Sequence, residues 1–383
     1  MVAPDAQRSA PPRAFRPSGK VLPEHARGHN RSLVLQTLYR GGLASRADLA
    51  RETGLTRVTI SDLVAELMND DLVIETGQRG ESRPGKPAIL LDINRTGFQI
   101  VGVDLSETGV FRGAVLDLDG TVVTRLEVET GGASGAEVTR IATRLTLELV
   151  AAADRPLLGV GIGSPGVVGI DGTVLSAPNL GWEGEPLQAT IAQATGLGVV
   201  VANDANAAAL AERSFGDAQG DLMLIRVGRG VGAGLIVGGT LLHGSRFAAG
   251  EIGHVVVGTD GGALCACGKH GCLETWLAVP HLRDGLAQAA SASERDAVLH
   301  RAGERLGIAL APVVGALNLD EVVISGPVEL LDGPLLGAAI ETFRTRTMPE
   351  FHGALAVRMS ALGQDIVMRG AAAMVLAGRL GVS

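Results

Sequence analysis

The hydrophobic pattern of this 383-residue chain changes its period near residue 98. Before that point, apolar residues recur at the spacing of an amphipathic helix, as at Ile60, Leu63, Val64 and Leu67. From Gln99 onward, short apolar or alternating runs typical of strands come first, and helical segments separate the later ones. Two patterns in one chain predict a small helical domain joined to a larger α/β body.

The N-terminal pattern predicts three short helices, at residues 31–40, at residues 45–54 and after Thr56. Ser45 is a favourable N-cap, with Asp48 three residues later in the position of a capping box. Gly54 is a typical helix stop. Strand candidates 73–76 and 88–91 follow, which makes residues 28–92 a candidate winged helix-turn-helix.

A winged helix-turn-helix binds DNA with the start of its second motif helix, here the third predicted helix. Its buried stripe leaves four residues facing outward: Thr56, Arg57, Thr59 and Ser61. The wing would add Arg83 and Lys86. Residues 80–87 nearly match a phosphate-binding P-loop, but Pro87 replaces the required hydroxyl. Helical hairpins also occur without nucleic acid, yet the wing and the local charge favour operator DNA.

Charge is divided unevenly along the chain. The net charge is −8, but residues 1–60 carry ten Arg or Lys against four Asp or Glu, so this segment is +6 and the remainder −14. A basic end on an acidic body suits phosphate attraction confined to one domain; a solvated tail is the alternative.

Residues 1–27 lack the apolar core of a secretory signal and are expected to form a flexible tail, with a transit peptide as the alternative. No apolar run is long enough for a transmembrane helix, so no membrane partner is expected.

The body begins with three strand candidates and a helix, followed by further strands interleaved with helices, at 100–104, 109–117, 121–129, 136–152 (helix), 157–163, 199–201 and 223–227. This order predicts an α/β architecture. A second strand-rich start near Met223 suggests two related lobes. Residues 161–166 match G-x-G-x-x-G, but Pro165 and the lack of a suitably placed acidic residue argue against a dinucleotide site.

Two further motifs have a functional and a structural interpretation. Glycine at every second position, at Gly228, Gly230, Gly232 and Gly234, would let backbone N–H groups approach a phosphate or a ring. The alternative is a turn packed against another backbone. Asp204, after a strand and at a helix start, could serve as a general base for a sugar hydroxyl in phosphoryl transfer, or it could merely cap the helix.

The chain has three cysteines, all within eight residues: Cys265, Cys267 and Cys272. An odd, crowded set argues against disulfides and for a metal site in a reducing compartment, so we expect a cytoplasmic protein. With one imidazole from His254 or His270, the set matches a closed, structural zinc site.

Together these motifs resemble the ROK family, which contains repressors, uncharacterised open reading frames and sugar kinases. The resemblance covers residues 30–383 and rests on segments in the family's order: 163–166, 177–182, 203–206, 250–254 and 265–274. It implies a two-lobed, actin-like ATPase fold with a cleft between the lobes. It also implies that zinc takes His254, and that the sugar pocket is lined by Asn203, Asp204, Glu251, His254 and Glu274, with Asp204 the catalytic base in active kinases.

The chain departs from the family's kinases at the nucleotide site. The turn after the first strand, Asp104 to Thr108, lacks the kinases' small residues and adds Glu107, which would repel phosphate. Arg229 stands where the second phosphate loop usually has Thr, and residues 325–327 replace a more glycine-rich turn. Degenerate phosphate loops beside a complete sugar site make ATP and Mg²⁺ poor candidates for cofactors.

We therefore expect a sugar-responsive transcriptional regulator, a repressor. Its domains would be a flexible tail at 1–27, a DNA-binding domain (the reader) at 28–92 and a sugar-binding ROK domain at 98–383. The C-terminal helix of the ROK domain would return to the first lobe. Its partners would be operator DNA and a small-molecule sugar effector. Paired half-sites imply a homodimer or homotetramer. The alternatives are an ATP-dependent, glucokinase-like sugar kinase and a constitutive DNA-binding protein with a vestigial pocket.

Overall fold

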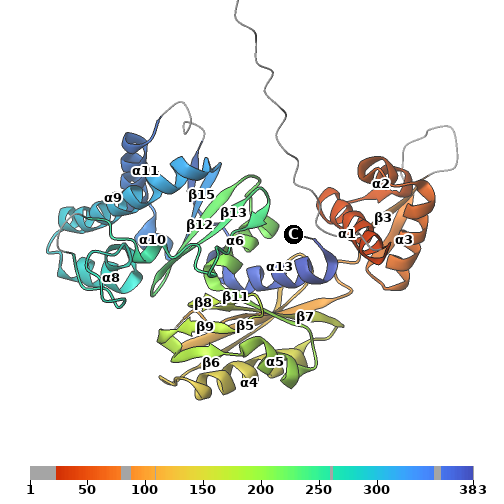
Figure 1. Ribbon diagram of the computed structural model, residues 1–383, viewed down its shortest axis with the longest axis horizontal. Helices are drawn as coiled ribbons and strands as arrows, with labels where there is room; N and C mark the ends of the chain where they lie inside the picture. The colour runs from red at the N-terminus through yellow and green to blue at the C-terminus, as the bar shows by residue number, and fades with distance from the viewer. Residues whose placement is uncertain (1–22, 79–87, 108, 259–261, 349–354, 383) are drawn as a thin grey trace, which may run out of the picture.

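The structure is a computed structural model that describes residues 23–78, 88–107, 109–258, 262–348 and 355–382 (Figure 1). Most of the expected tail lies outside the described residues, as do Arg83, Lys86 and Thr108. In the described part of the chain, no helix is long and apolar enough to cross a membrane.

The N-terminal body, residues 23–93, packs three helices against a three-stranded antiparallel sheet of order β1-β3-β2. Its elements are α1 (Pro23–Gly41), β1 (Ala44–Ser45), α2 (Arg46–Thr53), α3 (Arg57–Asn69), β2 (Val73–Gln78) and β3 (Ile89–Ile93). The predicted capping box is confirmed: Ser45 Oγ accepts from the Asp48 N–H at 3.2 Å, and Asp48 Oδ2 accepts from the Ser45 N–H at 3.1 Å. The predicted apolar stripe of α3 is also confirmed, because all four of its residues are buried.

Helix α1 is longer than predicted, because its first two turns carry no apolar stripe. Ion pairs hold this part of α1 against α3 instead: Arg27 reaches Glu66 at 2.6 Å, and Arg31 reaches Glu66 and Asp70 at 2.7 Å. Hydrophobic periodicity carries no signal for a segment docked by charge.

The first lobe, residues 99–203, is built on a five-stranded sheet of order β11-β7-β4-β5-β6. Strands β4, β5 and β6 are antiparallel, whereas β4, β7 and β11 are parallel. Helices α4 and α5 cover its outer face (Figure 1). The bounds are β4 (Gln99–Asp104), β5 (Val110–Leu116), β6 (Val122–Glu129), α4 (Ala136–Ala152), β7 (Leu157–Ser164), α5 (Leu187–Thr195) and β11 (Val199–Asn203), and a small sheet joins β8 (Val167–Val168), β9 (Val174–Ala177) and β10 (Trp182–Glu185), with the 3₁₀ turn η1 (Pro178–Leu180) between β9 and β10.

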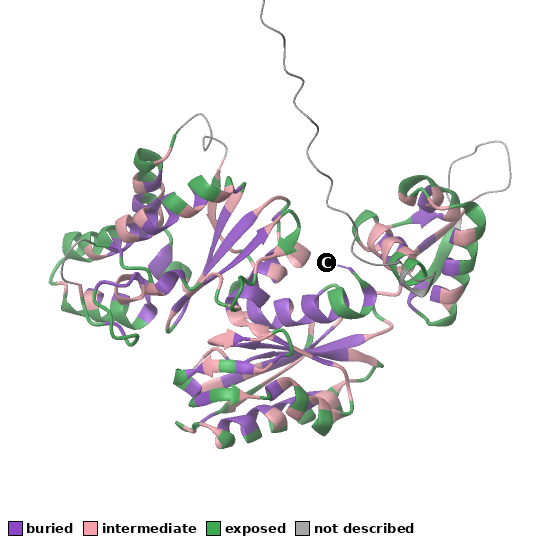
Figure 2. Cartoon of the chain, in the orientation of Figure 1, coloured by how far each residue is buried: buried purple, intermediate pink, exposed green. Residues whose placement is uncertain are grey.

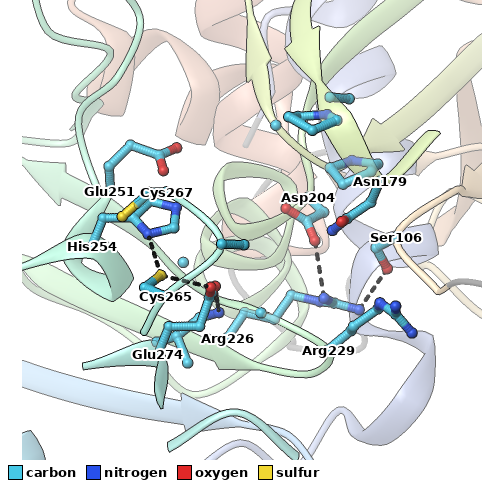
Figure 3. A pocket seen from close by; sticks show the side chains of 18 of the residues that line it. Ser106, Asn179, Asp204, Arg226, Arg229, Glu251, His254, Cys265, Cys267 and Glu274 are labelled. Carbon is cyan, nitrogen blue, oxygen red and sulfur yellow. Dashed lines mark hydrogen bonds and ion pairs between the residues drawn. The ribbon is translucent and has the colours of Figure 1, made fainter. Parts of the chain in front are cut away.

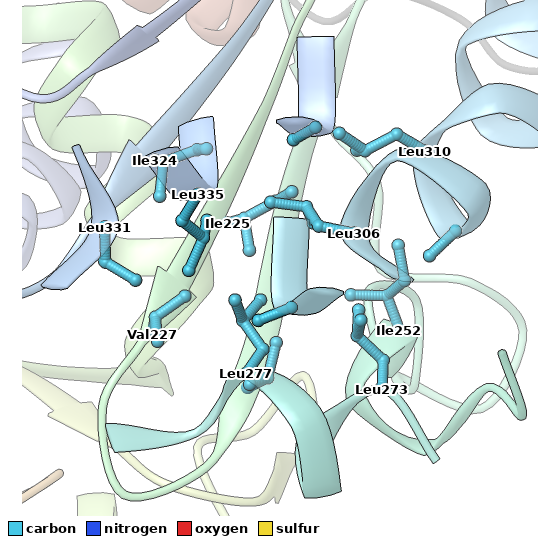
Figure 4. Close-up of a cluster of buried hydrophobic side chains, with 14 of the residues drawn as sticks. Ile225, Val227, Ile252, Leu273, Leu277, Leu306, Leu310, Ile324, Leu331 and Leu335 are labelled. Atoms are coloured by element: carbon cyan, nitrogen blue, oxygen red, sulfur yellow. The ribbon is translucent and has the colours of Figure 1, made fainter. Parts of the chain in front are cut away.

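The second lobe, residues 222–359, repeats this topology in a sheet of order β14-β13-β12-β15-β16, with three antiparallel strands followed by parallel pairing. Two related lobes were predicted from the strand-rich start near Met223. The core of this lobe lies between β12, β15 and the helices on its outer face (Figure 4). The bounds are β12 (Leu222–Val227), β13 (Val231–Val237), β14 (Thr240–Leu241), η2 (Ile252–His254), α7 (Glu274–Leu277), α8 (Val279–Gln288), α9 (Ala292–Leu317), β15 (Glu321–Ser325), α10 (Val328–Leu331), α11 (Pro334–Arg346) and β16 (Ala356–Met359).

Two buried helices lie between the sheets: α6 (Asp204–Phe215) and, after the turn η3 (Gly363–Asp365), α13 (Ile366–Leu380). Their burial is evident in Figure 2, where α13 is largely purple. Helix α13 packs on α6 and on strands β4 and β7. The approach is close, since a side chain at Gly370 would collide with the Ala207 carbonyl of α6.

At its end, the glycine run 228–234 allows another backbone to pack closely against it. A Cβ at Gly234 would lie 2.5 Å from the Ala205 carbonyl oxygen and 2.8 Å from Ala209 Cβ, so this glycine lets α6 pack on β13. Of the two interpretations left open for this run, the structural one therefore holds for Gly234.

One buried apolar cluster joins the N-terminal body to the first lobe and to the end of α13, and includes Val34, Leu38, Leu118 and Leu380. Tyr39 of α1 donates its hydroxyl to the Leu118 carbonyl at 2.6 Å, and the Arg95 guanidinium lies 5.1 Å from the centre of the Tyr39 ring. The N-terminal body is thus packed onto the body that holds α6 and α13.

Candidate functional site

A cavity of about 520 Å³ lies between the lobes, and both lobes contribute to its walls (Figure 3). All five residues predicted for the sugar pocket line it. The lining also includes Pro165, Gly166, Ala177, Pro178 and Asn179 from the first lobe, and Ser106, Arg226, Arg229, Gly230 and Gly232 from the turns facing the expected nucleotide site.

The N-cap of α6 is Asn203, not Asp204. Asn203 Oδ1 accepts from the N–H groups of Ala205 at 2.9 Å and Asn206 at 3.1 Å, while its Nδ2 donates to the Gly166 carbonyl at 2.9 Å. Asp204 is the first helical residue and not the N-cap, although its Oδ1 also accepts from the Ala205 N–H at 2.9 Å. Its carboxylate lines the cavity.

Arg226, which the sequence analysis did not single out, contacts that carboxylate. Arg226 Nη1 donates to Asp204 Oδ2 at 2.9 Å, and both side chains are 14% exposed. Arg226 Nη2 donates to Ser106 Oγ at 2.6 Å and lies 3.6 Å from Glu107 Oε1. A signal was present in the sequence, since Arg226 is the one charged residue in the apolar strand β12.

Asp204 and Arg226 each favour the charged form of the other. Burial raises the pKa of Asp204, and the Arg226 guanidinium works in the opposite direction. Burial also works against the charge of Arg226, but the carboxylates of Asp204, Asp104 and Glu107 raise its pKa. Arg226 is therefore a fixed cation next to the predicted base.

Glu251, His254 and Glu274 form the opposite wall of the cavity (Figure 3). Burial raises the pKa of Glu251, with smaller contributions from its charged neighbours. Glu274 Oε2 accepts from the Val231 N–H at 3.2 Å, and its Oε1 accepts from Cys265 Sγ at 3.6 Å. Glu274 thus links the second glycine turn to the cysteine loop.

The predicted metal ligands are brought together. The ligand atoms of His254, Cys265, Cys267 and Cys272 all lie within 4.8 Å of one another. His270, the competing candidate, instead lies 3.1 Å from the Gly262 carbonyl, outside this group. Burial raises the pKa of the Cys265 and Cys272 thiols, but a bound divalent cation would deprotonate them. The cluster could hold a metal ion.

The turn after β4 folds back on itself. Asp104 is 2% exposed, and its Oδ1 accepts from the Ser106 N–H at 2.9 Å and from the Ser106 hydroxyl. In the facing turn, the Gly228 N–H donates to the Gly230 carbonyl at 2.9 Å, and Arg229 is exposed. In each turn, an N–H or hydroxyl group that could bind a phosphate is therefore already hydrogen-bonded within the turn.

The predicted DNA-facing residues lie together at the exposed start of α3. Thr56 caps the helix by accepting from the Thr59 N–H at 3.2 Å, and Ser61 Oγ donates to the Arg57 carbonyl at 2.9 Å. Arg57 is exposed and makes no ion pair with the residues that the structure describes. By contrast, four other arginines of the basic segment are neutralised by acidic neighbours: Arg27, Arg31, Arg46 and Arg51.

Comparison with known proteins separates two kinds of relative. A xylose repressor of Caldicellulosiruptor bescii is 30% identical and the match covers 92% of this chain and 96% of that protein. A glucokinase of Halalkalibacterium halodurans is 34% identical, but the match covers 69% of this chain and 91% of that protein.

Solved structures give the same division. A ROK family transcriptional regulator, a homolog of the E. coli MLC protein, has a TM-score of 0.82 at 27% identity and covers 93% of this chain and 98% of its own. A Streptomyces griseus ROK glucokinase in complex with glucose and AMPPNP has a TM-score of 0.62 at 27% identity, over 72% of this chain and 98% of its own. The model of the ROK family matches residues 100–377. The chain therefore belongs to the ROK family.

Proposed function

We propose that this chain is a sugar-responsive transcriptional repressor. Its reader, residues 28–92, is a winged helix-turn-helix that binds operator DNA, and its body, residues 98–383, binds a sugar in the cavity between the lobes. The observation that carries the proposal is coverage: the repressor match extends over 92% of the chain, whereas the glucokinase match stops at 69%. The family model begins at residue 100, so the N-terminal body lies outside it.

The DNA surface in this proposal is the start of α3, where Arg57 is exposed and unpaired among the described residues. Thr56, Thr59 and Ser61 lie beside it on the same turn, and Arg83 and Lys86 would belong to the wing. Because two half-sites need two DNA-binding domains, the protein would act as a homodimer or homotetramer.

The sugar surface comprises Asp204 on one wall and Glu251, His254 and Glu274 on the other. Carboxylates suit a polyhydroxylated ligand because they accept hydrogen bonds from hydroxyl groups. The imidazole of His254, with one ring nitrogen on the metal, would donate its other N–H to a hydroxyl oxygen. Asn203 acts through its cap, which sets the position of Asp204.

A structural Zn²⁺ fits the cysteine loop, because three thiolates and one imidazole form a closed tetrahedral donor set. His254, Cys265, Cys267 and Cys272 would hold it. The ion would fix the loop that carries Glu274, because Glu274 follows the ligand Cys272 by two residues. It supplies rigidity to the sugar wall and takes no part in chemistry.

Sugar binding would reach the reader by a population shift between two arrangements of the lobes. Asp204 begins α6, α6 packs tightly on α13, and the end of α13 shares an apolar cluster with α1. A change at the cavity is therefore carried by packed helices to the reader.

The test is operator binding by fluorescence anisotropy on DNA upstream of the protein's own gene, with xylose, glucose and N-acetylglucosamine added in turn. One sugar should weaken binding of the wild-type protein. Glu251→Ala should keep DNA binding and lose the response, whereas Arg57→Ala should lose DNA binding and keep sugar binding. DNA binding that no sugar alters would favour the constitutive alternative.

A sugar kinase is the second candidate, favoured by Asp204 at the cavity wall and by 34% identity to a glucokinase. ADP release with Mg-ATP across the same sugars tests it. Turnover that is lost in Asp204→Asn would establish an enzyme, with Asp204 as its base.

A further inference from the structure

Arg226 occupies a position with a defined meaning in a sugar kinase. There, the transferred phosphoryl group lies between the base that activates the sugar hydroxyl and the turns that hold the nucleotide phosphates. In this chain the corresponding neighbours are Asp204 on one side and Ser106 on the other, and the Arg226 guanidinium hydrogen-bonds to both. Figure 3 shows Arg226 extended between them.

We propose that the Arg226 guanidinium takes the place of the transferred phosphoryl group and its metal ion, so that the cleft holds its sugar without a nucleotide. This inference rests on the proposed sugar site and names the residue that makes that site a receptor. It predicts that phosphoryl transfer is blocked even though the base is retained.

The Arg226 donors that a phosphoryl group would need are already directed at protein oxygens on both sides. Both nitrogens at the end of the fork are engaged, Nη1 with Asp204 at 2.9 Å and Nη2 with Ser106 at 2.6 Å. Ser106 in turn is tied to Asp104 through its N–H and its hydroxyl. A phosphate entering here would have to break a buried, charge-assisted network.

The charge balance also disfavours a nucleotide. Arg226 faces three carboxylates, those of Asp204, Asp104 and Glu107, so its positive charge is already matched. A kinase offsets the negative charge of the phosphates with metal ions and free basic groups. Here the phosphates would meet Asp104 and Glu107 with Arg226 already paired, which leaves the exposed Arg229 of the facing turn to offset their charge.

The same contacts join the two lobes. Arg226 stands on β12 of the second lobe, whereas Ser106 and Glu107 stand on the turn after β4 of the first. In a nucleotide-dependent enzyme the bound phosphates bridge these turns. A guanidinium that bridges them permanently orients Asp204 as a hydrogen-bond acceptor before the sugar arrives, which lowers the ordering cost of binding.

The test uses the full-length, zinc-loaded protein and begins without sugar. Hydrogen–deuterium exchange is measured in the peptides around residues 104–107 and 203–206 for wild type and Arg226→Gln. The matched control, Arg144→Gln, removes an arginine from the exposed face of α4, where its side chain is 61% exposed. Arg226→Gln should raise exchange about tenfold in both peptides, and the control in neither.

If Arg226→Gln does not fold, Arg226→Lys tests whether Arg226 bridges Asp204 and Ser106. A lysine is a single point charge without the planar fork, so it can stay with Asp204 but cannot also hold Ser106. Exchange should then rise around 104–107 and remain near wild type around 203–206. Unchanged exchange at 104–107 in this variant would overturn the bridge.

Calorimetry with millimolar Mg-AMPPNP tests the second half of the inference. Wild-type protein should show no nucleotide binding, and its affinity for xylose or glucose should be the same with and without the nucleotide. Micromolar nucleotide binding, or a sugar affinity that Mg-AMPPNP raises, would overturn the inference. Failure of every sugar to bind would instead refute the proposed function, while the exchange and nucleotide measurements would still decide the role of Arg226.

Discussion

Tyr39 is the only tyrosine of the chain, and it lies where the N-terminal body meets the first lobe. Its hydroxyl donates to the Leu118 carbonyl at 2.6 Å, and Arg95 stacks on its ring. Burial raises the pKa of Tyr39; Asp119 and Asp117 add to this shift, and Arg95 opposes it. We therefore predict that raising the pH weakens this junction and that one tyrosine reports on it.

The direction and size of this pH effect follow from the linkage between proton binding at Tyr39 and docking of the N-terminal body. The docked state prefers the neutral phenol, so its stabilising contribution is complete below the ordinary pKa of 10.0 and is lost as the pH rises through the raised pKa. Within that interval the free energy of docking falls by about 1.4 kcal/mol for each pH unit. Because a coupling free energy is typically about 1–3 kcal/mol, a loss of this size is enough to uncouple the reader.

The assay is the ultraviolet absorbance of tyrosinate after a rapid pH jump, since neither Trp182 nor Trp276 ionises. In the sugar-free protein, Tyr39 should ionise above its ordinary pKa. If the effector releases the reader from the first lobe, adding it should move the titration back toward the ordinary value. Titration at the ordinary pKa in the folded, sugar-free protein would refute the burial of Tyr39 and the junction built on it.

Three other perturbations have definite outcomes. Asn203→Ala removes the N-cap of α6 and should lower the free energy of unfolding by about 1–2 kcal/mol in urea titrations, whereas Asn203→Ser should restore most of it; equal losses would contradict the cap. Cys272→Ser, at a ligand with no solvent exposure, should release zinc to a colorimetric chelator and lower the melting temperature, and an unchanged zinc content would exclude Cys272 as a ligand. Gly370→Ala forces a methyl group against the Ala207 carbonyl and should cost about 1–3 kcal/mol in stability, while also reducing the sugar response measured by anisotropy. A stable Gly370→Ala protein with a normal response would argue against α13 as the connection.

Local signals in the sequence were sufficient for much of the fold. The cap of α2 at Ser45 and its end at Gly54 depend on hydrogen bonds within a few residues, so their positions could be predicted. The five strands of the main first-lobe sheet were predicted within one or two residues, and the central strands β4 and β7 gave the clearest signal because their apolar runs are buried on both faces. Helix α1 was underestimated because ion pairs to α3 leave no periodic trace.

At the candidate site too, features that depend on spacing along the chain could be predicted, and features that depend on the fold could not. The four residues of the candidate metal cluster were predictable because three of them fall within eight positions and a zinc set has a recognisable composition. The assignment of the imidazole needed the fold, which places His254 in the cluster and His270 beside Gly262. The glycine run was ambiguous in one dimension, because a glycine that admits a ligand and one that admits a helix are the same residue.

The sequence alone therefore determined the order of the main first-lobe strands, the capping box of α2, the three cysteines of the candidate metal cluster and the family, since each depends on spacing along the chain. Tertiary structure decided that Asn203 caps α6 while Asp204 faces the cavity, and that Arg226 joins Asp204 to Ser106, which precedes Arg226 by 120 residues. A lone arginine in an apolar strand becomes interpretable only when its partners are known, because the free energy of a buried charge depends on the groups around it.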